Sequence, residues 1–187
     1  AAQVKTPVDA FILKKLSDSG LPARFSAPAD ASTLERRLSY TVTGLPPHLT
    51  VTAPGGSTSD LIEQLLSSPH YGEHWARHWL DVARYADSNG LDENVALGHA
   101  WRYRDYVVNA FNSDKPYDQF VIEQIAGDLL PASDTTSRLE ALTATGFLAL
   151  GAKVLAEPDM EKLKLDIIDE QIDTVGKAFM AMTRGCV

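Results

Sequence analysis

Residues 68–89 read SPHYGEHWARHWLDVARYADSN and contain two of the three tryptophans and three of the five histidines of the chain. Pro69 suits the first turn of a helix, where a missing backbone N–H costs nothing. Apolar residues then recur at helical spacing and predict one buried stripe, formed by Trp75, Trp79, Leu80, Val82, Ala83 and Ala86. Asn89-Gly90 is the stop signal, because both residue types tolerate the left-handed conformation that ends helices. The stretch therefore predicts a long helix at the centre of the core.

Helical patterns also cover most of the chain on either side of this stretch, each with a start signal such as Thr6-Pro7 or a stop signal such as Pro131. The predicted helices cover residues 6–19, a short segment from Asp30 or Ser32 to about Gly44, residues 57–68, 100–111 and 117–130, a segment from Thr135 or Ser137 to Gly151, and about 159–182. No segment alternates convincingly as a strand would. The predicted fold class is all-α, an irregular multi-helix bundle of about seven or eight helices, in a single domain of residues 1–187.

Composition excludes several classes of protein. The chain has 187 residues, of which 44% are hydrophobic and 22% charged, which is typical of a globular protein with a real core. Its net charge of −8 argues against a nucleic-acid partner, since phosphate binding needs clustered lysine and arginine. No apolar run is long enough for a membrane span. Residues 1–5 lack the apolar segment of a signal peptide, which leaves the compartment open.

Two histidines of the central helix, His74 and His78, lie one turn apart, and Asp81 follows as a third potential metal ligand. A zincin motif would need glutamate directly after the first histidine, where Trp75 stands, and no histidine follows a glutamate by three positions as in di-iron bundles. The alternative is that both histidines lie on the helix surface or at the edge of the core, with hydrogen-bond partners. No metal site is predicted.

A second candidate is a polar cluster on the central helix and the helix that follows it. Its members are His78, Asp81, Arg84, Asp87, Arg102 and Asp105. The functional interpretation is a site that holds an anionic group. The structural interpretation is a partly buried ion-pair network that fixes the packing of the two helices. The tryptophans Trp75, Trp79 and Trp101 are interpreted as core anchors.

The single cysteine, Cys186, has no partner for an internal disulfide. Gly185-Cys186-Val187 is either a tail with a free thiol or the first half of Cys-x-x-Cys-His, the haem-attachment pattern. That pattern needs two thiols and a histidine, and only the first thiol is present in residues 1–187.

Several phrases occur in an order that resembles a known family. They are PVDAFI (7–12), TLERRL (33–38), TGLPP (43–47), SPHYGE (68–73), RHWLDVARYADS (77–88), WRYRD (101–105), PYDQF (116–120) and QIAGDLLP (124–131). Together they resemble the DUF1549 domain, the planctomycete cytochrome type 2 (PSCyt2) family of large exported proteins. One departure is His74, which stands where the family often has arginine.

The resemblance implies that a c-type cytochrome module and a DUF1553 domain flank this domain in the same protein. It also implies that the last helix leads into Gly-Cys-x-x-Cys-His, so that the chain ends inside this motif. Haem c is then expected to attach at Cys186 in the full-length protein. Residues 1–187 alone are not expected to hold haem, because they contain only the first thiol of the motif. The implied role is periplasmic or exported electron transfer, with an unidentified redox partner, in support of a catabolic system such as polysaccharide degradation.

Two other classes of function remain open from the sequence. One is a hydrolase or glycan-binding module that uses the polar cluster. The other is a helical scaffold without chemistry of its own. No catalytic residue is assigned, and the sequence leaves open whether the protein is an enzyme.

Overall fold

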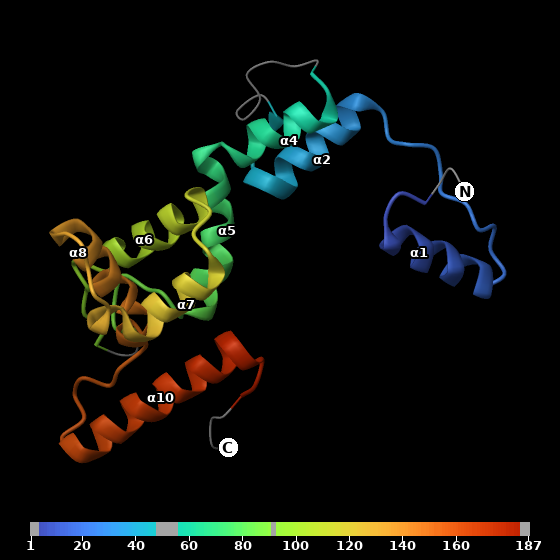
Figure 1. The fold of residues 1–187 in the computed structure, drawn as a ribbon. Coiled ribbons are helices and arrows are strands. Elements are labelled where there is room, and N and C mark those ends of the chain that lie inside the picture. The colour runs from blue at the N-terminus through green and yellow to red at the C-terminus, as the bar shows by residue number, and fades with distance from the viewer. Residues whose placement is uncertain (1–3, 48–55, 91–92, 184–187) are drawn as a thin grey trace. The chain divides into compact units, whose positions relative to one another are not determined.

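The computed structural model describes residues 4–47, 56–90 and 93–183. Within these residues all regular structure is helical, apart from an isolated bridge between Ser88 and Ala96 (Figure 1). The prediction of an all-α fold is therefore confirmed. The chain divides into two compact units, Ala1–Glu35 and Arg36–Val187.

In the first unit, helix α1 (Pro7–Asp18) begins where the sequence predicts. Thr6 and Asp9 form a capping box, in which the backbone N–H of Thr6 donates to Asp9 Oδ2 at 2.7 Å. Backbone hydrogen bonds from Lys5 and Thr6 lower the pKa of Asp9. Asp30 caps the next helix, α2 (Ala31–Thr43), of which only the first residues belong to this unit, by accepting from the backbone N–H of Thr33 at 2.9 Å. Both helix starts thus follow from local polar groups that satisfy backbone donors.

In the second unit, α4 (Thr58–Leu66) leads into the central helix α5 (Pro69–Val82). The predicted continuation of this helix to Asn89 is wrong. It ends at Val82 because Arg84 adopts a left-handed conformation with φ 56°. The backbone N–H of Tyr85 bonds to Leu80 O at 2.9 Å, and that of Arg84 to Asp81 O at 3.2 Å. This is the Schellman arrangement, with arginine where glycine is usual.

Asn89, the predicted stop, instead holds the loop that follows α5. Its side chain is buried, and its Oδ1 accepts from the backbone N–H of Val95 at 2.6 Å. Its Nδ2 donates to the carbonyl of Lys153 at 3.0 Å. A single amide thus joins the loop after α5 to the segment before the last helix.

Helices α6 (Trp101–Asn112), α7 (Tyr117–Ala126) and α8 (Thr135–Ala144) follow, with a short 3-10 turn, η1 (Gly127–Leu129), after α7. The predicted single helix up to Gly151 is interrupted at Thr145, after which α9 (Gly146–Ala149) is only one turn. The start of α8 also differs from the prediction, which names Thr135 or Ser137 as the cap. Asp134 provides the cap instead and accepts from the N–H of Ser137 at 2.9 Å.

Helix α6 packs along α5, with which it shares more contacts than any other pair of helices (Figure 1). Gly72 permits this approach, because a Cβ atom there would lie 2.5 Å from the carbonyl oxygen of Val108. The backbone N–H of Gly72 donates to Asn112 Oδ1 at 2.8 Å. At the start of α5, the backbone of this helix therefore contacts the Asn112 side chain of α6 directly.

The last helix, α10 (Met160–Met180), is capped by Asp159 and ends at Ala181, which is left-handed. Its Phe179 packs on Trp79 of α5, with ring centroids 5.8 Å apart. Trp79 also contacts Phe120 and Phe147, so it anchors the core as predicted. Trp101 does not, because 45% of it is exposed. Val82, predicted in the buried stripe, is exposed as well, because the stripe ends where α5 ends.

In the part of the chain that the structure describes, no helix combines the length and the apolar character needed to cross a bilayer.

Candidate functional site

A chain of hydrogen bonds crosses the core between α5, α6 and α7. Trp79 Nε1 donates to Tyr103 Oη at 2.9 Å, and the hydroxyl of Tyr103 donates to Gln124 Oε1 at 2.7 Å. Burial raises the pKa of Tyr103 well above its ordinary value. The phenol therefore stays neutral and serves as both donor and acceptor inside the core.

A second buried network centres on Glu123 of α7. Its Oε2 accepts from the hydroxyl of Tyr106 and from Lys115 Nζ, both at 2.6 Å, and its Oε1 accepts from Gln119 Nε2 at 2.9 Å. Burial alone would raise the pKa of Glu123. The hydrogen bonds from Lys115, Tyr106 and Gln119 outweigh it, so the pKa is lowered. Glu123 is thus a fully partnered carboxylate, and it neutralises the charge of Lys115.

Two members of the predicted polar cluster, Asp87 and Asp105, lie near one tyrosine. The hydroxyl of Tyr85 donates to Asp87 Oδ1 at 2.5 Å. Arg104 binds Asp105 Oδ1 through Nε at 3.0 Å and Nη2 at 2.9 Å. Burial raises the pKa of Tyr85 to about 12, and the hydrogen bond to Asp87 adds to this effect. These carboxylates already have local partners.

Arg84, another predicted member, forms an ion pair with Glu170 of α10. Partial burial lowers the pKa of Arg84, whereas the nearby charge of Asp173 acts in the opposite direction. Gly151 lies against this pair, since a Cβ atom there would meet both charged groups. Arg84 therefore links the end of α5 to α10, a connection that the sequence analysis did not foresee.

The remaining members make other contacts. The His78 ring lies against Trp75 and His74, with centroids 5.4 and 5.9 Å away. The guanidinium of Arg102 lies over the ring of Trp101 at 5.6 Å. Asp81 is exposed on α5. Among the described residues, no three His, Cys, Asp or Glu side chains are grouped so that they can hold a metal ion.

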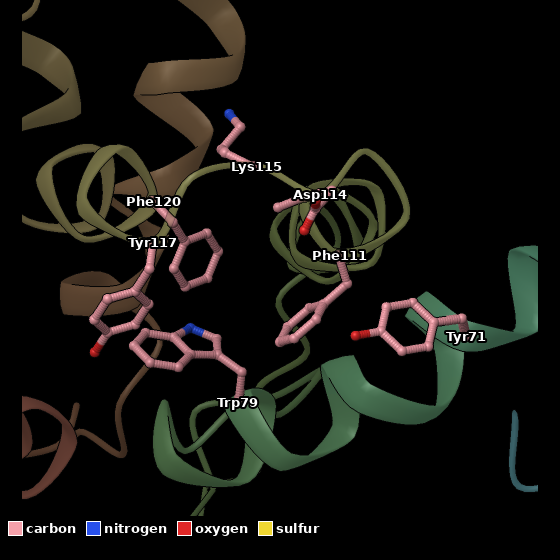
Figure 2. Close-up of a pocket in the computed structure, with 8 residues that line it drawn as sticks. Tyr71, Trp79, Phe111, Asp114, Lys115, Tyr117 and Phe120 are labelled. Atoms are coloured by element: carbon pink, nitrogen blue, oxygen red, sulfur yellow. The ribbon is translucent and has the colours of Figure 1, made fainter. Parts of the chain in front are cut away.

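An aromatic pocket lies at the C-terminal end of α6 and was not anticipated from the sequence (Figure 2). Its volume is about 220 Å³, and it is lined by Tyr71, Trp79, Ala110, Phe111, Asp114, Lys115, Tyr117 and Phe120. These residues come from α5, from the end of α6, from the turn after it and from the start of α7. Their helical spacing is that of an ordinary core stripe, so only the packing of three helices shows that they enclose a cavity.

The residue expected to carry a cofactor, Cys186, lies outside the described residues. Six positions before it, Met180 helps to line an apolar groove of about 260 Å³ on α10, together with Leu148, Ile168, Gln171, Ile172 and Val175. The lining is almost entirely apolar and includes one thioether.

Comparison with family models identifies PSCyt2, a protein of unknown function (DUF1549), which matches residues 7–187. No curated protein and no solved structure matches the chain.

Proposed function

The chain belongs to the PSCyt2 (DUF1549) family, and we propose that it is the helical part of a c-type-cytochrome-like protein that transfers electrons through haem. The observation that carries this proposal is that the family match extends to residue 187 and so includes Cys186, the only cysteine of the chain. In c-type cytochromes a Cys-x-x-Cys-His segment attaches the haem, and Cys186 fits the first position of that pattern.

Within this proposal Cys186 would hold the haem through one thioether bond. When bound, the haem supplies reversible one-electron transfer at its iron. The ion pair between Arg84 and Glu170, together with the contact of Phe179 with Trp79, holds α10 on the rest of the unit.

An exposed apolar face on α10 supports the proposal that this chain is part of a larger protein. Leu165, Ile168 and Ile172 are 65%, 50% and 48% exposed. Apolar side chains that follow one another on a helix face are commonly covered by another domain. The proposal assigns this role to the neighbouring cytochrome c or DUF1553-type domain of the same protein. The protein is then periplasmic or otherwise exported, and passes electrons to a partner in a catabolic system.

The test is to produce the complete gene product, with whatever follows residue 187, in a host that attaches haem c. We expect covalent haem on denaturing gels, a c-type pyridine haemochrome spectrum, and loss of both in Cys186→Ser. Far-ultraviolet circular dichroism checks that both proteins are helical. A helical, correctly exported protein without covalent haem contradicts the proposal and leaves the helical scaffold as the better interpretation.

A further inference from the structure

We propose that the aromatic pocket between α5, α6 and α7 binds a small organic cation of the quaternary or alkyl-ammonium class. This site is separate from Cys186, and the inference does not rest on the haem proposal. Five aromatic rings form the walls of the pocket (Figure 2), namely Tyr71, Trp79, Phe111, Tyr117 and Phe120. Aromatic faces attract cations through the negative charge above the ring, and enclosures of several rings recognise quaternary ammonium groups.

Phe120 packs edge to face against two of the other rings of the lining. Phe120 meets Trp79 at 73° with centroids 4.9 Å apart, and meets Phe111 at 62° and 6.3 Å. Tyr117 is 65% exposed and forms the outer wall. A volume of about 220 Å³ is below the ~300 Å³ at which pockets for drug-sized ligands begin. The pocket therefore suits a small head group.

The charges around the pocket favour a cation. Lys115, the only cation of the lining, is paired with Glu123 at 2.6 Å, and Figure 2 shows its ammonium group directed away from the rings. Asp114 is exposed, and within the described part of the chain its carboxylate has no hydrogen-bond or ion-pair partner. The pocket thus presents one unpaired negative charge and no unpaired positive charge among its lining residues.

The end of α6 fixes the position of Asp114. The backbone N–H of Asp114 bonds to Phe111 O at 3.2 Å, and that of Lys115 to Ala110 O at 3.0 Å. These are the two bonds of a Schellman ending, with Asp114 left-handed at φ 50°. The turn after α6 therefore holds Asp114 in the lining of the pocket.

Other small ligands fit this lining less well. An anion would meet the Asp114 carboxylate without an available cation, because Lys115 is paired with Glu123. A sugar needs several hydrogen-bond partners, whereas the side chains of the lining that are not already engaged offer the Asp114 carboxylate and tyrosine hydroxyls. An organic cation needs aromatic faces and one carboxylate, and the pocket provides both.

The test titrates the 187-residue protein with tetramethylammonium chloride at constant ionic strength, followed by two-dimensional NMR and calorimetry. The neutral isostere tert-butanol is the matched ligand control. We expect shifts of the Trp79 indole and of residues around Phe111 and Tyr117, and affinity for tetramethylammonium about fivefold or more above that for tert-butanol. Raising the salt concentration should weaken only the binding of the cation.

Two pairs of variants locate the site. Asp114→Asn keeps a residue type that tolerates the left-handed conformation, and should weaken tetramethylammonium binding about two- to fivefold. Asp118→Asn, at an exposed neighbour outside the lining, should leave binding unchanged. Tyr117→Ala should weaken tetramethylammonium binding by a similar factor. Tyr117→Phe retains the aromatic ring and should leave the affinity unchanged. Equal affinity for both ligands, absence of tetramethylammonium binding, or shifts elsewhere would overturn the proposal.

Discussion

Lys115 Nζ lies 2.6 Å from Glu123 Oε2, and the two side chains are only 13% and 7% exposed. The pair joins the turn after α6 to the second turn of α7. Tyr106 of α6 donates to the same carboxylate, and the ammonium of Lys115 lies over the Tyr106 ring at 5.0 Å. One buried carboxylate therefore sets the geometry of the two helices that form half of the aromatic pocket.

Replacing this carboxylate should destabilise the fold strongly. In Glu123→Gln, Lys115 keeps its charge in a buried position without a counter-ion, and the free energy of unfolding should fall by about 3 kcal/mol. Urea denaturation at neutral pH measures the change. The control is Glu161→Gln, which breaks the exposed pair of Glu161 with Lys164 and should change stability by less than about 0.5 kcal/mol. Equal effects of both substitutions would contradict the assignment.

The same carboxylate makes stability depend on pH. Its pKa is lower in the folded protein than in the unfolded chain, so the stabilisation is complete above the unfolded value of about 4.5 and is lost as pH falls through the folded value. The stability difference between wild type and Glu123→Gln should therefore shrink as the pH is lowered from 6 to 3. Urea denaturation at each pH measures it, and a difference that grows on acidification would contradict the assigned sign.

The end of α5 gives a test of backbone strain at Arg84. Arg84→Gly and Arg84→Ala both remove the ion pair with Glu170, but only glycine adopts φ 56° without a steric penalty. Arg84→Gly should be more stable than Arg84→Ala by about 1 kcal/mol. At Ala83, where φ is −73°, glycine should instead be less stable than alanine by about 0.5–1 kcal/mol. Thermal or urea unfolding of all four proteins checks the opposite signs.

Gly127 should not tolerate a side chain. A Cβ atom there would lie 2.0 Å from the carbonyl oxygen of Ala141 in α8, a backbone atom that cannot rotate away. Gly127→Ala is expected to lower the free energy of unfolding by about 2 kcal/mol or more. Gly98→Ala is the matched control, because nothing lies within 4 Å of a Cβ atom at that position. A stable Gly127→Ala protein would show that η1 and α8 are farther apart than described.

Much of the fold could be predicted because helix starts are local. Thr6, Asp30, Ser57 and Asp159 each bind backbone donors two or three residues ahead, so a short window of sequence contains the whole interaction. The end of α5 could not be predicted in this way. Asn89-Gly90 is the stronger stop signal, yet the helix ends at Val82, because Arg84 is left-handed. The side chain of Arg84 reaches Glu170, a residue 86 positions later in the sequence.

The candidate sites divide in the same manner. The predicted polar cluster consists of His78, Asp81, Arg84, Asp87, Arg102 and Asp105. The structure gives these residues different partners, and only Asp87 and Asp105 lie near the same tyrosine. The aromatic pocket had no separate signal, because Trp79 and Phe120 have the spacing of core residues whether or not a cavity lies between them.

By itself the sequence determined the helical class, most helix starts, the absence of a long apolar span and the family, since these depend on residues close together or on ordered phrases. The tertiary structure alone decided where α5 ends, which carboxylate Arg84 binds, and that the rings of α5, α6 and α7 enclose a cavity. The physical reason is that these features depend on contacts between distant segments, and the free energy of such contacts overrides local propensity.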